Sequence, residues 1–193
     1  MSRTPAGLEL GANLRPAVCD TNAVDEYSWT QQTPIGRMTV RAGKKGVRSI
    51  AFGASAAKRT APVPPAGRRI AKAIDRYFDG DALALERVPV DLDGVPNDFQ
   101  RKVLATLRGL VGPGQTISYG ELAAAVGHPG AARAVGTALA RTPVPIVVPC
   151  HRVLAADGSI GGYGAAGTGV KRRLLAIEGT VVGKGRRSRA TPR

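Results

Sequence analysis

Two adjacent residues with reactive side chains, Cys150 and His151, follow a proline-rich apolar segment. A thiol becomes a nucleophile as the thiolate, which a nearby base or cation favours, and His151 and Arg152 supply both kinds of group. Consecutive side chains of an extended segment point to opposite faces, so we expect a water between Cys150 and His151. A buried cysteine is also commonly an inert small apolar residue, and the pair alone leaves both interpretations open.

The segment before Cys150 is shaped by its prolines. Pro143, Pro145 and Pro149 flank an apolar run, and each proline fixes its own φ angle and lacks a backbone donor. We therefore exclude a helix here and predict a stiff extended segment that presents Cys150 at a defined position.

Two features follow the cysteine. Residues 160–167 form a glycine-rich stretch that can lie flat over a ligand, with Tyr163 as its large side chain. Glu178 ends the helical pattern of residues 170–178, where an acid opposes the helix dipole by up to about 1 kcal/mol. A cation beside it, such as protonated His151, would remove that conflict; a solvent-screened surface glutamate is the alternative.

The first half of the chain predicts a small antiparallel sheet and a helix. Short β-rich segments at 27–33, 37–41 and 47–52 are separated by turns rich in proline and glycine. Apolar residues within 70–78 recur at three- and four-residue spacing, which predicts an amphipathic helix. Residues 83–90 are expected to add an edge strand.

The second half predicts short helices. Asn97 is a good N-cap with Gln100 three residues on, and Ser118 with Glu121 forms a capping box. A third helix at 131–141 is rich in alanine and, with the helix before it, makes a candidate helix-turn-helix. Its small side chains fit either tight packing against a neighbouring helix or close approach to nucleic acid, and the composition leaves both open.

The charge of the chain is strongly positive. Its 193 residues carry 28 Lys and Arg against 14 Asp and Glu, a net charge of +14. This imbalance favours a polyanionic partner such as nucleic acid, although a merely soluble basic surface has the same composition. We expect a cytoplasmic protein without membrane association, because no apolar run could span a bilayer, residues 1–26 do not resemble a secretion signal and two cysteines make no disulfide framework.

Several ordered sequence blocks resemble the O6-alkylguanine-DNA alkyltransferases. The blocks are Ala-Ala-Arg-Ala-Val-Gly at 131–136, Pro-Val-Pro-Ile at 143–146, Pro-Cys-His-Arg-Val at 149–153, Gly-Gly-Tyr at 161–163 and Leu-Leu-Ala-Ile-Glu-Gly at 174–179. The resemblance runs from about Phe99 to Gly179. It implies an α/β plus α fold, in which a small RNase H-like antiparallel-sheet domain precedes a winged helix-turn-helix domain.

The resemblance implies DNA repair by direct damage reversal in a single turnover. Cys150 would accept a methyl or other alkyl group from O6-alkylguanine in double-stranded DNA. His151 would take the thiol proton through a water, and Glu178 would orient the imidazole. Tyr119 would donate a proton to the departing guanine, and Arg133 would enter the base stack where the nucleotide is flipped out.

The resemblance also implies residues that contact DNA or line a substrate pocket. Ala131, Ala132 and Ala134 would let the recognition helix lie in the minor groove, with Tyr119 beside it. Backbone carbonyls of Cys150 and Val153 would bind the guanine amino group. The implied pocket residues are Pro145, Val153, Tyr163 and Gly164.

Two positions depart from the family or limit what it implies. Thr142 stands where most members have an asparagine that ties the recognition helix to the active-site turn, and a hydroxyl cannot replace both bonds of an amide across that hinge. The family's occasional zinc site needs several Cys and His ligands, whereas Cys19 is the only such residue before His128. We therefore expect neither a metal nor a cofactor.

The expected organisation has five segments. They are an irregular leader (1–26), an RNase H-like α/β domain (27–91), a linker (92–95), a winged-helix alkyltransferase domain (96–180) and a basic disordered tail (181–193). We expect a monomer. One alternative function is recognition of alkylated DNA with impaired or no transfer, which the presence of Cys150 disfavours. A cysteine hydrolase is another, disfavoured by the helix-turn-helix and the positive charge.

Overall fold

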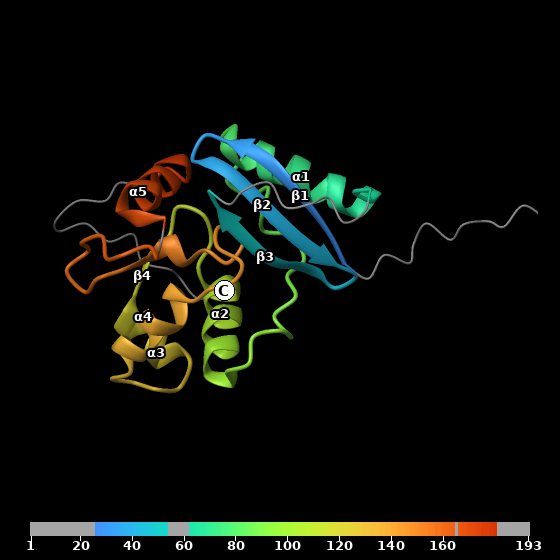
Figure 1. Ribbon diagram of the computed structural model, residues 1–193. Helices are drawn as coiled ribbons and strands as arrows, with labels where there is room; N and C mark the ends of the chain where they lie inside the picture. The colour runs from blue at the N-terminus through green and yellow to red at the C-terminus, as the bar shows by residue number, and fades with distance from the viewer. Residues whose placement is uncertain (1–25, 54–61, 165, 181–193) are drawn as a thin grey trace, which may run out of the picture.

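The computed structural model describes residues 26–53, 62–164 and 166–180. Cys19, the basic tail and nearly all of the expected leader lie outside these residues. The described part is a mixed α/β fold with five α-helices, a three-stranded sheet, a two-stranded pair and one short 3-10 turn (Figure 1).

The three predicted strands are confirmed, and they form an antiparallel sheet in the order β1, β2, β3. The strands are β1 (Glu26–Thr33), β2 (Gly36–Gly43) and β3 (Gly46–Phe52). The first therefore begins at Glu26, a residue that we assigned to the leader. Thr33 pairs with Gly36 and Gly43 pairs with Gly46, so two short hairpin turns fix the register of the sheet.

Helix α1 (Pro65–Phe78) packs against β1 and contains the predicted amphipathic segment. It starts at Pro65, because a proline at the first helical position needs no backbone donor. Ile70, Ile74 and Tyr77 are buried on one side of the helix, as their spacing predicts. The helix thus directs the Tyr77 side chain into the interior.

The expected edge strand at residues 83–90 is wrong. The segment forms consecutive turns, held by bonds such as Glu86 N to Leu83 O and Val88 N to Leu85 O, and only Val90 makes a bridge to the sheet, with Val47. The physical reason is that its backbone groups find partners elsewhere: the Arg108 guanidinium donates to the carbonyls of Glu86 and Val88.

The predicted helices of the second half are present. They are α2 (Asp98–Leu110), α3 (Tyr119–Ala125), α4 (Ala132–Ala140) and α5 (Gly167–Ile177). The Asn97 side chain accepts from the Gln100 amide, and Ser118 with Glu121 makes both bonds of the capping box. Helix α4 packs against α2 and α3 and is one residue shorter at each end than predicted.

The proline-rich segment before Cys150 is not extended, which corrects our prediction. Residues 143–149 form turns, Ile146 has a φ of +72°, and a 3-10 turn η1 (Cys150–Arg152) follows. A φ near −65° fits a turn or the start of a 3-10 helix as well as a strand, so prolines alone do not decide between them. The following β5 (Val153–Leu154) pairs in parallel with β4 (Ile117–Ser118), and this pairing fixes the chain after the cysteine.

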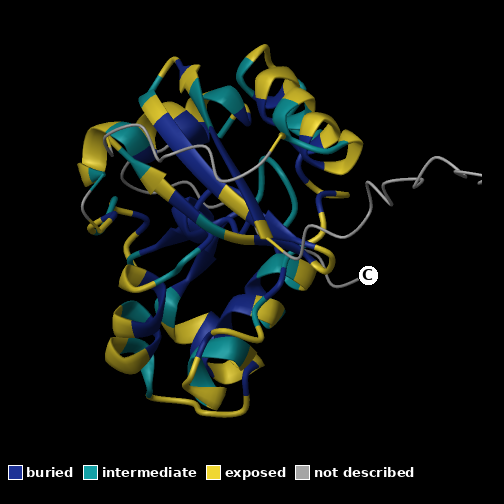
Figure 2. Cartoon of the chain, turned by 45° about the vertical axis from the view of Figure 1, so that its right-hand side comes forward, coloured by how far each residue is buried: buried dark blue, intermediate teal, exposed yellow. Residues whose placement is uncertain are grey.

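One cluster of buried apolar residues extends through both halves of the chain, from the sheet to α5 (Figure 2). It includes Met38 of β2, Tyr77 of α1, Leu107 of α2 and Leu174 of α5. Among the residues described, none of the helices combines the length and apolar character needed to cross a membrane.

The two hairpin turns of the sheet offer a matched test of the close contact between Gly46 and Pro89. A Cβ at Gly46 (φ +133°) would lie 2.3 Å from the Pro89 carbonyl oxygen, whereas a Cβ at Gly36 (φ +110°) would have nothing within 4 Å. Alanine at either site would carry about 1–2 kcal/mol of backbone strain, because φ is positive there. We expect Gly46→Ala to lower the free energy of unfolding in urea by at least about 2 kcal/mol more than Gly36→Ala. Equal losses would contradict the contact.

Candidate active site

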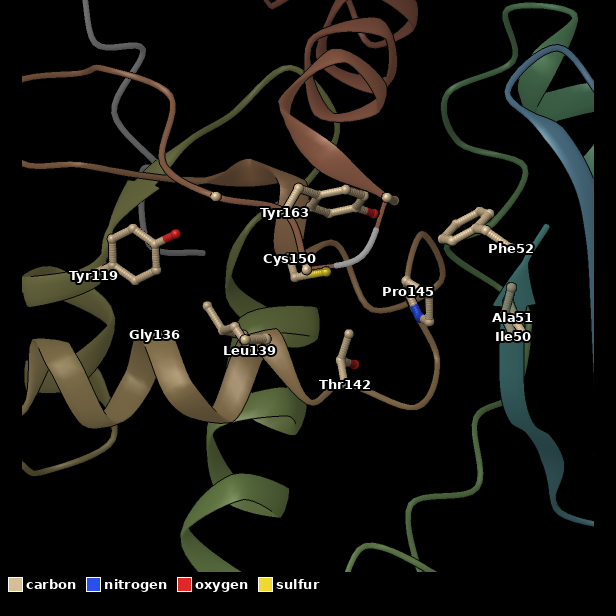
Figure 3. A pocket seen from close by; sticks show the side chains of 14 residues that line it. Ile50, Ala51, Phe52, Tyr119, Gly136, Leu139, Thr142, Pro145, Cys150 and Tyr163 are labelled. Atoms are coloured by element: carbon tan, nitrogen blue, oxygen red, sulfur yellow. The ribbon is translucent and has the colours of Figure 1, made fainter. Parts of the chain in front are cut away.

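Cys150 lies in the wall of a cavity of about 500 Å³ (Figure 3). Both halves of the chain enclose this cavity: β3 forms one wall, and the start of α3, helix α4 with the loop after it, and the glycine-rich loop form the others. The residue is buried, with 6% of its surface exposed. The volume is within the range of small-molecule sites, so the cavity has room for a small organic group.

The thiol is protonated in the resting protein. Burial raises the pKa of Cys150 to about 11, while the nearby Tyr163 hydroxyl and Lys171 ammonium lower it by less. Tyr163 lies against the thiol, although its hydroxyl meets no partner at hydrogen-bond geometry among the described residues. The thiol therefore needs a base before it can act as a nucleophile.

His151, the next residue in the chain, is a candidate for that base. Its ring is fully buried, and Nε2 lies 2.8 Å from Glu178 Oε1. Since a carboxylate only accepts, Nε2 carries the proton and Nδ1 keeps its lone pair. Nδ1 has no partner within the described part of the chain, so no bond joins it directly to Cys150. Burial lowers the pKa of His151 despite the neighbouring Glu178, which leaves a neutral imidazole at neutral pH.

Glu178 accepts hydrogen bonds from four donor atoms. Its Oε1 accepts from His151 Nε2, from the Tyr77 hydroxyl at 3.0 Å and from Arg152 Nη2 at 2.9 Å, and its Oε2 accepts from Arg152 Nε at 2.9 Å. Burial alone raises the pKa of Glu178, but His151 and Arg152 outweigh it and lower the pKa to about 2. The cation that we expected beside Glu178 is therefore Arg152, because His151 is neutral.

Arg152 links this carboxylate to a second one. Its Nη1 and Nη2 each lie 3.1 Å from Glu86 Oε1, and Nη1 also donates to the Val111 carbonyl. The guanidinium is thus bound on all sides and faces Glu178, although we first considered it as a cation for the thiolate.

Lys171 supplies a positive charge close to the thiol. It is fully buried, its Nζ donates to the Val153 carbonyl at 2.6 Å, and the same atom lies 5.9 Å from the centre of the Tyr119 ring. Burial lowers the pKa of Lys171 to about 8, and Cys150 acts against this shift. At pH 7 the group is still mostly an ammonium, which favours a thiolate at Cys150.

Tyr119 begins α3 and reaches the cavity from the side opposite Phe52 and Pro145 (Figure 3). Two glycines leave room for it. A Cβ on Gly161 would lie 3.1 Å from its hydroxyl, and one on Gly136 would lie 3.8 Å from its ring. Burial, and secondly the charge of Cys150, raises the pKa of Tyr119, so the phenol keeps its proton at neutral pH.

The predicted DNA-contact residues of α4 lie outside the cavity. Arg133 and Ala134 are exposed, and Ala131 and Ala132 are partly buried at the start of the helix. The later part of α4, with Gly136, lines the cavity. The exposed start of α4 therefore lies next to the cavity that holds Cys150.

The structure brings most of the predicted pocket residues together. Pro145, Tyr163 and Gly164 line the cavity with Cys150, but Val153 does not: it is fully buried in β5, and its carbonyl is bound by Lys171. Thr142 lines the cavity, and its buried hydroxyl has no partner among the described residues. The Thr142 hydroxyl thus makes neither of the two bonds that the resemblance implies for an asparagine at this position.

No cluster of three or more Cys, His, Asp or Glu side chains within the described residues could hold a metal ion. Cys19 lies outside them.

Comparison with known proteins then identifies the family. Residues 98–180 match the family model described as 6-O-methylguanine DNA methyltransferase, DNA binding domain. The chain is also 36% identical over 171 residues to the methylated-DNA–protein-cysteine methyltransferase of Mus musculus, covering 79% of this chain and 81% of that protein. The chain belongs to the methylated-DNA–protein-cysteine methyltransferase family.

Solved structures of this family have the same fold. The Mycobacterium tuberculosis OGT structure, determined in complex with DNA, has a TM-score of 0.65 at 38% identity, covering 79% of this chain and 92% of that one. The O6-methylguanine-DNA methyltransferase of Pyrococcus kodakaraensis has a TM-score of 0.57 at 30% identity, covering 79% and 99%.

Sequence reasoning missed the β3 residues that line the cavity of this family member. It also missed three residues with polar groups: Tyr77, Glu86 and Lys171. Tyr77 looked like an ordinary apolar position of an amphipathic helix, and Glu86 like a polar position of a strand. Only Lys171 could have been found from the sequence, because it lies within the apolar pattern of α5. A buried lysine is rare unless it has a specific partner.

Lys171 provides a test of the electrostatic activation of the thiol. Lys171→Met keeps an unbranched side chain that is one atom shorter and removes its charge, so we expect alkylation of Cys150 by iodoacetamide at pH 8 to slow by about tenfold. Lys72→Met, on the exposed side of α1, is the matched control and should react like the wild type. Equal rates for the two variants would show that the ammonium does not act on Cys150.

Proposed function

We propose that this protein repairs O6-alkylguanine in double-stranded DNA by transferring the alkyl group to the sulfur of Cys150. The observation that carries the proposal is a thiol in the wall of a cavity of about 500 Å³, next in the chain to a neutral imidazole. The Nε2 of that imidazole is bound to Glu178, and its Nδ1 has no partner among the described residues. Membership of the methyltransferase family supports the same reaction.

The proposed reaction needs no cofactor, because the side chains and water account for every bond and proton. His151 Nδ1 takes the thiol proton through a water, and the thiolate attacks the alkyl carbon in line with its bond to O6. The new carbon–sulfur bond forms as the carbon–oxygen bond breaks, and the electron pair of that bond goes to guanine. Tyr119 donates a proton to guanine and regains one from the imidazolium through solvent. The thioether has no route to hydrolysis here, so each molecule acts once.

The proposed DNA interface is the α3–turn–α4 unit, acting as a helix-turn-helix, with β4 and β5 beside it as part of a winged-helix domain. Arg133 is exposed at the start of α4, where it could replace a flipped nucleotide in the stack. The start of α4 carries the small side chains of Ala131, Ala132 and Ala134, so the helix can enter a minor groove without a steric clash. The net charge of +14 supports binding to a polyanion.

The finer organisation is part of the same proposal. We infer an RNase H-like domain over 27–91, a linker at 92–95 and the winged-helix domain over 96–180, in a monomeric and cytoplasmic protein. The antiparallel meander covered by α1 supports the first of these assignments.

The transfer itself is tested by mass spectrometry. Incubation with duplex DNA that carries one O6-methylguanine should add one methyl group to the peptide containing Cys150 and saturate at one methyl group per protein molecule. Cys150→Ser should gain nothing and still bind the duplex. Binding without any mass gain in the wild type would instead support a recognition module.

Base flipping is tested at Arg133. Arg133→Ala should slow methyl transfer from duplex DNA by about tenfold or more, because the unstacked gap is left unfilled, and should leave transfer from free O6-methylguanine base nearly unchanged. Arg141→Ala, which removes an exposed arginine just past the end of α4, is the control for loss of charge alone. Equal losses on both substrates would count against flipping.

A further inference from the structure

Two side chains from the first half of the chain reach the buried ion network of the candidate active site. Tyr77 of α1 donates to Glu178 Oε1, and Glu86, from the turns after α1, accepts from Arg152. Both lie outside residues 98–180, the segment that matches the family's DNA-binding domain. Neither touches the cavity that holds Cys150.

We propose that Tyr77 and Glu86 are positioning residues through which the first half of the chain sets the basicity of His151, and so the pH range in which Cys150 is activated. The proposal rests on the proposed function for its consequence in methyl transfer. It rests on the contacts alone for its effect on His151.

The effect of Tyr77 follows from the oxygen that it shares with His151. Its hydroxyl and His151 Nε2 both donate to Oε1 of Glu178, at 3.0 and 2.8 Å. The phenol therefore takes up part of the negative charge that would otherwise favour a proton on His151. Without the phenol, Oε1 attracts the imidazolium form more strongly, and the basicity of His151 rises.

Glu86 acts in the opposite direction. It lies against the far side of Arg152, with 33% of its side chain exposed, and its charge offsets part of the guanidinium charge. Without the Glu86 carboxylate, the positive field of Arg152 at His151 is stronger, and protonation of the imidazole becomes harder. Loss of Tyr77 and loss of Glu86 thus change the basicity of His151 in opposite directions.

The other groups that face His151 stay constant in this comparison. They are Lys171 from α5, Glu178 at the end of that helix, Arg152 from η1, and the Tyr163 ring, which meets the His151 ring edge-on at 6.4 Å. Lys171 and Arg152 oppose a proton on His151, and Glu178 favours one. A change at Tyr77 or Glu86 therefore reaches His151 through Glu178 and Arg152.

Nuclear magnetic resonance can measure this directly, because the chain has only two histidines, His128 and His151. Long-range proton–nitrogen spectra of the full chain are recorded against pH for the wild type, Tyr77→Phe and Glu86→Gln. We expect the pKa of His151 to rise by about 0.5 to 1 pH unit in Tyr77→Phe and to fall by a smaller amount in Glu86→Gln. His128, exposed on the turn before α4, serves as the internal reference in all three spectra.

The outcomes separate this inference from the proposed function. If both variants leave the pKa of His151 unchanged, or move it in the same direction, the inference is wrong even where methyl transfer is intact. Should Tyr77→Phe fail to fold, the sign of the Glu86→Gln shift decides. If the wild type transfers methyl groups, the acid limb of the transfer rate should move with the measured pKa of His151. A purely structural role would lower the melting temperature and leave that limb in place.

Discussion

A buried carboxylate must be compensated, and in this fold the compensation of Glu178 determines how the rest of the site is arranged. Its partners come from two separate parts of the chain, Tyr77 on α1 and His151 with Arg152 on the 3-10 turn, and Glu178 itself caps the end of α5. Removing one partner from a buried ion pair typically costs about 3–5 kcal/mol, so the network restricts these elements to one relative placement. The position of Cys150 follows, because it is covalently next to His151.

The same network explains why the resting protein holds a protonated thiol beside a neutral base. Arg152 carries the positive charge that Glu178 requires, so His151 need not be protonated, and burial keeps it neutral. Burial likewise keeps Cys150 as a thiol, with Lys171 as a nearby cation once the proton leaves. In the proposed reaction, which uses Cys150 once, this arrangement protects the thiol, because a thiolate exposed at all times would react with other electrophiles.

The parts of the structure that sequence predicted are those set by local interactions. The strands, the amphipathic α1, the cap at Asn97 and the capping box at Ser118 each depend on residues a few positions apart. The errors arose where distant groups decide the backbone: Arg108 takes the carbonyls that an edge strand at 83–90 would have used. Most site residues were carried by the family resemblance, whereas the contacts of Tyr77 and Glu86 with the site span 101 and 66 positions and leave no local pattern.

The candidate site is therefore a product of both halves of the chain, although the proposed nucleophile and base lie within the second. Residues 98–180 taken alone would lack the β3 wall of the cavity, the donor at Tyr77 and the acceptor at Glu86. Arg152 would still bind Glu178, but its outer nitrogens would lose their carboxylate, and Oε1 of Glu178 would lose a donor that it shares with His151. These losses act on His151 with opposite sign, so the first half contributes a balance of charge at the base as well as a surface against which the second half packs.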